Sequence, residues 1–86
     1  MASTPSRHGI VLYHAQECSL CDRARSVLDT VGAEYDSVDI TGVPELEAAY
    51  REWLPVVEID GERAFVYFVD EAALRRRLAR RERPGL

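Results

Sequence analysis

A short apolar run and a segment of alternating polarity, separated by a helical segment, limit the folds open to this chain. Residues 10–13 are uniformly apolar, which is typical of a strand buried on both faces. Residues 18–31 place apolar side chains at three- and four-residue steps, as a helix does, and Gly32 provides its end. Residues 35–40 alternate between faces, as a half-buried strand does. A right-handed crossover then makes the two strands parallel.

A second helix and a hairpin are predicted next. Pro44 suits the first turn of a helix, where its missing N–H costs nothing. The apolar stripe of this helix consists of Leu46, Ala49, Tyr50 and Trp53. Residues 56–59 and 64–69 predict two strands, and Asp60-Gly61 between them is a strong hairpin signal. The hairpin should therefore be antiparallel.

A final helix completes the predicted order. Asp70 can cap its N-terminus, and the residues expected to face the core are Ala73, Leu74 and Leu78. The order β-α-β-α-β-β-α predicts an α/β domain in which three helices flank a four-stranded mixed sheet on both faces. Because 86 residues are too few for two domains, we expect one domain over residues 10–82. Residues 1–9 are expected to be a disordered lead-in and residues 83–86 a C-terminal tail.

Charge and hydropathy disfavour several classes of function. A formal net charge of −4 argues against nucleic-acid binding, which relies on a surplus of cations. No apolar run approaches the roughly 20 residues that cross a bilayer. The first nine residues lack the apolar segment of about 7–15 residues found in secretory signals. We therefore expect a cytoplasmic monomer without a membrane or nucleic-acid partner.

The two cysteines of the chain, Cys18 and Cys21, are the main candidates for chemistry. A bridge across three positions closes a small loop and removes little unfolded-state entropy, so a purely structural disulfide is a poor explanation. A cysteine at a helix start is favoured as thiolate by free N–H groups and the helix dipole. Cys18 is therefore the predicted nucleophile and Cys21 the resolving thiol. Glu17 and Asp22, beside the pair, oppose ionisation.

The same spacing also fits half of a zinc site. Structural zinc takes four ligands, and the chain offers His8 and His14 besides the cysteines. Neither histidine stands at a recognised spacing, so metal binding is a less favoured alternative. For His14, a loop position without a catalytic role is the simpler interpretation. No cofactor is expected.

Taken together, these segments resemble the glutaredoxin-like family of the thioredoxin superfamily. The matching segments are Val11-Leu12-Tyr13, Cys18-Ser19-Leu20-Cys21-Asp22, Val38-Asp39-Ile40, Pro44-Glu45-Leu46 and Leu54-Pro55-Val56-Val57-Glu58-Ile59-Asp60-Gly61. The resemblance covers about residues 9–78. It implies a thioredoxin fold and a thiol–disulfide oxidoreductase that reduces disulfides of proteins or small molecules.

The resemblance also implies substrate-binding residues. The proline before the third strand, Pro55, is expected to follow a cis peptide bond. That bond would turn the Leu54 backbone toward the cysteines, where it can pair with a polypeptide or glutathione. Asp70 is implied as a contact for the γ-glutamyl end of glutathione.

Three departures from the family pattern make glutathione a doubtful partner. Ala15 stands where glutaredoxins carry a lysine that binds a glutathione carboxylate. Ser19-Leu20 replaces the usual Pro-Tyr between the cysteines. Residues 66–71 lack the usual glycine pair. The partner expected first is therefore a disulfide-containing protein or another small thiol.

A binding module without catalysis is the second hypothesis for the same fold. In that case Tyr67 and Phe68 would be exposed and would contact a partner protein. Core packing of one of the two rings is the simpler expectation.

Overall fold

The computed structural model describes residues 9–82. Its elements are β1 (Ile10–His14), α1 (Ser19–Val31), β2 (Asp36–Asp39), α2 (Pro44–Tyr50), η1 (Arg51–Trp53), β3 (Val56–Ile59), β4 (Glu62–Val66) and α3 (Glu71–Glu82). The predicted order is confirmed, with the short 3-10 helix η1 added after α2. Most of the predicted lead-in, residues 1–8, and the predicted tail, residues 83–86, lie outside the described residues.

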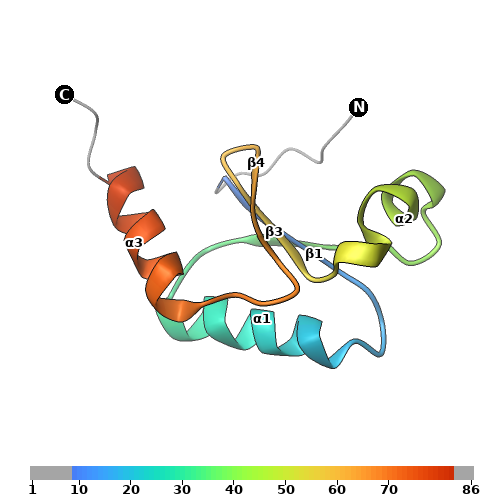
Figure 1. Cartoon of the computed structure of the whole chain (residues 1–86), viewed down its shortest axis with the longest axis horizontal. Coiled ribbons are helices and arrows are strands. Elements are labelled where there is room, and N and C mark those ends of the chain that lie inside the picture. Colours follow the sequence, from blue (N-terminus) through green and yellow to red (C-terminus); the bar gives the residue numbers. More distant parts are fainter. Residues whose placement is uncertain (1–8, 83–86) are drawn as a thin grey trace.

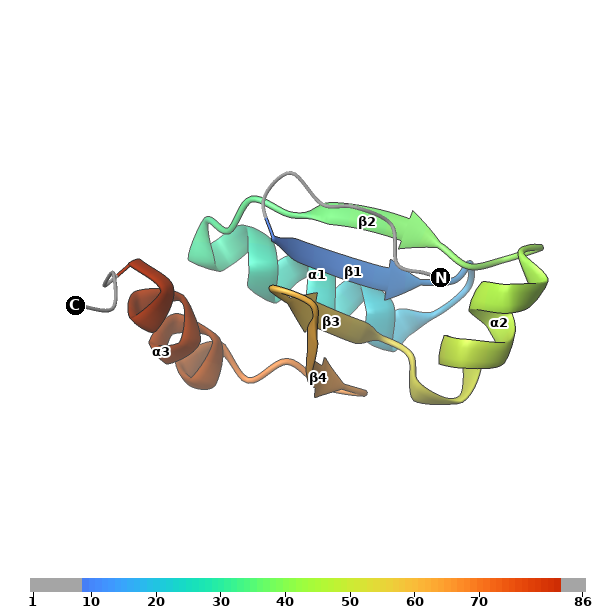
Figure 2. The same ribbon diagram turned by 90° about the horizontal axis from the view of Figure 1, so that it is seen from above.

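The four strands form one mixed sheet in the order β2-β1-β3-β4 (Figure 2). β1 and β2 are parallel, as the crossover through α1 predicts. β3 is antiparallel to both of its neighbours, β1 and β4. Leu12 of β1 lies opposite Ser37 on one side and Val57 on the other. β1 is thus an inner strand, which explains its uninterrupted apolar run.

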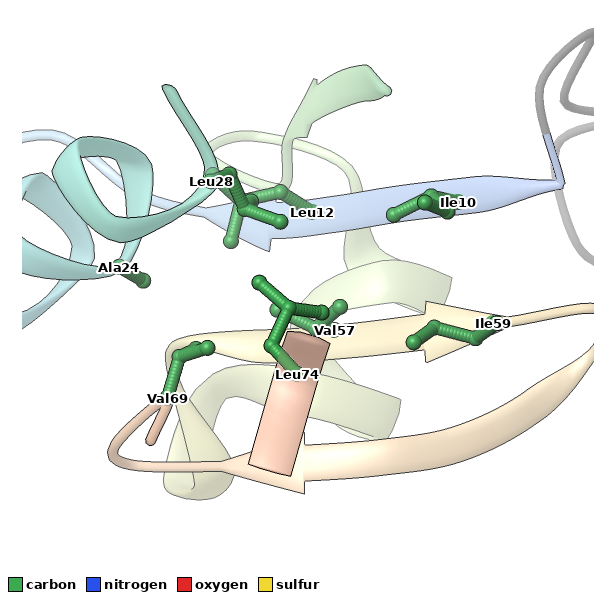
Figure 3. Packing of buried hydrophobic residues seen from close by; sticks show 8 residues of the cluster. All are labelled: Ile10, Leu12, Ala24, Leu28, Val57, Ile59, Val69 and Leu74. Atoms are coloured by element: carbon green, nitrogen blue, oxygen red, sulfur yellow. The ribbon is translucent and has the colours of Figure 1, made fainter. Parts of the chain in front are cut away.

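The helices α1 and α3 pack on one face of the sheet. The core on this face consists of Ile10, Leu12, Ala24, Leu28, Val57, Ile59, Val69 and Leu74 (Figure 3). Leu28 and Leu74 are fully buried there, and each such side chain stabilises the fold by about 1.5–3 kcal/mol. α1 ends as predicted at Gly32, whose φ of 82° lets its N–H reach the Leu28 carbonyl at 3.1 Å.

α2 lies at one end of the sheet (Figure 1), and its Tyr50 packs on the other face. The buried residues there are Val11, Tyr13, Ile40, Tyr50 and Val56. The rings of Tyr13 and Tyr50 stack with centroids 4.0 Å apart. The Tyr50 hydroxyl donates a hydrogen bond of 2.7 Å to Glu58 Oε2. Helices therefore flank both faces, as the sequence predicts.

Two boundaries differ from the sequence-based expectation. The α-helix ends at Tyr50 and continues as η1, and the change of pitch leaves Trp53 42% exposed instead of in the apolar stripe. The fourth strand spans Glu62–Val66 rather than residues 64–69. It ends because Tyr67 adopts a φ of 68° and donates its N–H to the Pro55 carbonyl at 2.9 Å. The chain then turns toward α3.

No helix within residues 9–82 combines the length and the apolar character that crossing a bilayer requires. The longest of them, α1, has 13 residues, and a span needs roughly 20.

Candidate functional site

Cys18 occupies the N-cap of α1. The helix therefore begins at Ser19, one residue after its predicted start at Cys18. Its backbone is extended, and its Sγ accepts a hydrogen bond of 3.1 Å from the N–H of Cys21. The Cys18 carbonyl accepts the Asp22 N–H at 3.1 Å, which closes the first helical turn. The sulfur therefore lies among the N–H groups that have no partner within the helix, where negative charge is stabilised.

Cys18 and Cys21 are joined by a disulfide, with Cα atoms 5.2 Å apart. The two residues differ in access to solvent. Cys18 is partly exposed, whereas Cys21 faces the core and keeps only 3% of its surface exposed. An external sulfur can therefore approach Cys18 more readily than Cys21.

The carboxylates on either side of the pair are on the surface. Glu17 and Asp22 are both exposed, so water and salt screen their effect on a thiolate. Glu17 has a φ of 56°, a left-handed conformation that turns the chain from the loop after β1 into α1. This turn brings Cys18 to the helix end.

The loop that precedes β3 contributes the cis peptide bond Leu54–Pro55, as the family resemblance implies. Pro55 is fully buried, and Leu54 is half-buried. Val56, the next residue, pairs with Tyr13 near the end of β1. The loop therefore lies at the end of the sheet where β1 stops and the chain leads on to α1 (Figure 2).

Asp70 caps α3, as predicted. Its Oδ2 accepts the Ala73 N–H at 2.8 Å, and its carbonyl accepts the Leu74 N–H at 2.9 Å. The side chain is exposed. One carboxylate oxygen is thus committed to the helix, which gives Asp70 a structural role regardless of any ligand.

His14 ends β1, four residues before Cys18. Burial lowers the pKa of His14 below its usual value, and the positive charge of Arg25 lowers it further, while Asp39 and Asp22 partly oppose the shift. Within residues 9–82, no three His, Cys, Asp or Glu side chains are grouped so that they could hold a metal ion. His8, the other histidine considered for zinc, lies outside the described residues.

A group of exposed apolar side chains comes from the segment between the cysteines, from the loop before β3 and from the segment after β4. It comprises Leu20 (46% exposed), Trp53 (42%), Tyr67 (47%) and Phe68 (68%). We call these four residues the aromatic platform. The rings of Trp53 and Tyr67 are 5.9 Å apart and tilted by 37°. The expectation that one of the rings of Tyr67 and Phe68 packs in the core is wrong, because both are exposed. Trp53 was not predicted as a surface contact, although its place directly before Leu54-Pro55 was a usable signal.

A groove of about 340 Å³ runs between α1 and the segment after β4. Its lining consists of Leu20, Arg23, Ala24, Ser26, Val27, Tyr67, Phe68 and Val69. Leu20 lies between the two cysteines in the sequence, so the groove begins beside the dithiol. The position of this groove could not be read from local sequence, because its two walls are about 40 residues apart in the chain.

The fold and the dithiol at the N-terminus of α1 define a thioredoxin-fold protein. The family model described as Glutaredoxin-like domain matches residues 9–79. The chain therefore belongs to the glutaredoxin-like domain family, as the resemblance of its motifs predicted. No curated protein is similar to the chain at a significant level.

Solved structures agree with this assignment. The structural genomics target protein XcR50 from X. campestris is 30% identical, with a TM-score of 0.74, and the match covers 83% of this chain and 96% of that one. The thioredoxin-like protein BC3987, solved as a mutant, is 21% identical, with a TM-score of 0.65 and coverage of 83% and 95%. A buckwheat glutaredoxin in complex with glutathione is 22% identical, with a TM-score of 0.61 and coverage of 83% and 70%. The last two matches concern the fold.

Proposed function

We propose that this protein is a thiol–disulfide oxidoreductase, with Cys18 as nucleophile and Cys21 as resolving thiol. The observation that carries the proposal is the position of the Cys18 sulfur. It caps α1, accepts the Cys21 N–H at 3.1 Å and belongs to the more exposed of the two bridged residues. These are the conditions under which one thiol ionises and a neighbouring thiol resolves the product.

The proposed reaction transfers two electrons to a substrate disulfide, RSSR′. The Cys18 thiolate attacks one substrate sulfur, so that a Cys18–SR bond forms, the substrate S–S bond breaks and R′S⁻ leaves and takes a proton from solvent. Cys21 then loses its proton to solvent, and its thiolate attacks the Cys18 sulfur. The Cys18–Cys21 bond forms, and RS⁻ leaves and is protonated. An external thiol or dithiol returns the two electrons to the protein.

The loop before β3 is the proposed docking point for the substrate backbone. Pro55 is buried against the sheet and Leu54 is half-buried, so the backbone of Leu54 is the part of the loop that can pair with an extended chain. Asp70, at the N-terminus of α3, is the third proposed contact. Its cap to Ala73 occupies only one of its two carboxylate oxygens.

A disulfide-containing protein or a small thiol is the proposed partner class. The related buckwheat glutaredoxin binds glutathione, but this chain has Ala15 where a lysine would bind a carboxylate. It also has Tyr67-Phe68 in the segment where glutaredoxins carry glycines. These residues support a partner other than glutathione. We propose that the protein acts as a cytoplasmic monomer. The cytoplasm keeps thiols reduced, so a dithiol there can be returned to its reduced form after each reaction.

The test is disulfide reduction by cysteine variants, measured with insulin and with a small aromatic disulfide. Cys18→Ser should lower the rate by more than about 100-fold, because it removes the attacking thiolate. Serine is itself a strong N-cap, so this variant should keep α1 intact. Cys21→Ala should accumulate a mixed disulfide at Cys18, visible as added mass. Thr30→Ala, an exposed position near the far end of α1, is the matched control and should retain its rate.

Unchanged reduction by Cys18→Ser would refute the proposal. A dithiol that stays unreactive across a glutathione redox series would instead favour the binding module without catalysis. Zinc or iron in protein purified under reducing conditions would favour the metal-binding alternative.

A further inference from the structure

The exposed apolar surface of this protein is concentrated at one place. Of the five large hydrophobic side chains that are exposed within residues 9–82, four form the aromatic platform, and the fifth, Val43, belongs to the N-terminus of α2. Single exposed apolar residues are ordinary on a protein surface, whereas a cluster marks an interaction site. The clustering of the platform residues therefore indicates a binding site for a partner molecule.

Backbone geometry gives a second reason to assign the platform a role. Tyr67 adopts a φ of 68°, a conformation that glycine adopts freely and that a bulky residue adopts at a cost. Hydrogen bonds from its N–H to Pro55 O (2.9 Å) and Trp53 O (3.3 Å) hold the residue there. Core packing does not explain the choice of tyrosine, because its side chain is exposed. A surface role, such as contact with a binding partner, explains the tyrosine better, and its ring lies beside that of Trp53.

The platform includes Leu20, which belongs to the segment between the two cysteines. Leu20 lies between the two cysteines and forms one end of the 340 Å³ groove, which extends along α1 to Val27. Tyr67 and Phe68 form the facing wall. A volume near the lower end of the range for ligand sites, about 300–1,000 Å³, suits one bulky side chain rather than a large cofactor.

We propose that the aromatic platform binds a bulky apolar side chain next to the reacting cysteine of an extended polypeptide. The preferred substrates are then polypeptide disulfides flanked by aromatic or large aliphatic residues. This inference rests on the proposed oxidoreductase function. When a substrate sulfur bonds to Cys18, the neighbouring substrate residues come close to the Cys18–Cys21 segment, and Leu20 of the platform belongs to that segment.

Peptide disulfides that differ at one position test this preference. The probes are the oxidised dimers of acetyl-Gly-Phe-Cys-Gly-amide and acetyl-Gly-Gly-Cys-Gly-amide. Wild-type protein should reduce the Phe peptide with a kcat/KM about tenfold above that of the Gly peptide, as a hydrophobic contact of this size provides. The double variant Tyr67→Gly/Phe68→Ala should bring this ratio close to one. Val43→Ala, the matched control outside the platform, should keep the wild-type ratio.

A binding measurement separates this inference from the proposed reaction. Trp53 is the only tryptophan of the chain and belongs to the platform, so its fluorescence reports occupancy without any redox step. The peptide acetyl-Gly-Phe-Ser-Gly-amide should give a saturable change in Trp53 fluorescence. The acetyl-Gly-Gly-Ser-Gly-amide peptide should bind with a Kd at least about tenfold higher. The double variant should lose the difference, provided that circular dichroism shows it folded.

Two outcomes would overturn the inference. One is equal reduction and equal binding of the Phe and Gly peptides by wild-type protein. The other is concentration-dependent dimerisation of wild-type protein that the double variant abolishes, which would make a second copy of the chain the occupant. Absence of turnover with both peptides, combined with selective binding of the Phe peptide, would refute the proposed oxidoreductase function but support the binding of apolar side chains by the platform.

Discussion

Replacing Asp70 should weaken the start of α3 in two separable steps. The Asp70 carboxylate accepts the Ala73 N–H at 2.8 Å, and its charge lies at the positive end of the α3 dipole. Asp70→Ala removes both contributions, about 1 kcal/mol for the cap and about 0.3–1 kcal/mol for the charge. Asp70→Asn keeps a capping oxygen and removes only the charge. The expected order of stability is therefore wild type, Asp70→Asn, Asp70→Ala.

Urea unfolding followed by circular dichroism measures this order. In a domain of this size, 1 kcal/mol corresponds to about 4–8 °C in Tm, so a thermal scan resolves the alanine variant as well. In 1 M salt, the difference between wild type and Asp70→Asn should shrink because the charge is screened. An alanine variant as stable as wild type would refute the capping argument. Reduced kcat/KM in Asp70→Asn, measured where circular dichroism shows the variant fully folded, would support Asp70 as a substrate contact.

Three further predictions concern the hydrophobic core, His14 at the end of β1 and the aromatic platform. Leu28→Ala, in the fully buried core, should cost about 2–5 kcal/mol and lower the urea midpoint; a loss below 1 kcal/mol would contradict the packing described. Because burial and Arg25 lower the pKa of folded His14, the unfolded chain binds the proton more tightly, so stability falls as pH drops below the usual histidine range of about 6.5. His14→Gln should flatten urea stability between about pH 7 and pH 5, and an unchanged pH profile would contradict this. Tyr67→Gly relieves about 1 kcal/mol of backbone strain and loses about 0.5–1.5 kcal/mol of contact with Trp53, so Tm should change by only a few degrees; a loss above about 2 kcal/mol would make Tyr67 a structural residue.

Local patterns were sufficient for most of the fold. The spacing of apolar residues and Gly32 predicted α1, which begins one residue after Cys18. The third strand has the predicted bounds, Val56–Ile59, because its apolar residues are followed directly by the Asp60-Gly61 turn. The cis bond at Pro55 was implied by the family resemblance, since an isolated Leu-Pro pair is also compatible with the trans form.

Features that depend on distant contacts were not predictable in this way. The end of β4 is set by the hydrogen bond between Tyr67 and Pro55, twelve positions earlier. The Trp53–Tyr67 ring pair and the groove beside α1 arise from the same approach of two segments. The positive φ of Tyr67 could not be predicted either, because the apolar residues 64–69 favour a continuous strand when only local propensity is considered.

The most direct test of the proposed dithiol chemistry is thiol trapping across a dithiothreitol redox series. Rapid alkylation followed by mass spectrometry counts the free thiols at each potential. We expect one two-electron transition, with Cys18 and Cys21 protected together, because they form a single disulfide. In the reduced protein Cys18 should be alkylated faster than the buried Cys21. Two thiols that stay free at every potential, or faster alkylation of Cys21, would contradict the proposed dithiol chemistry.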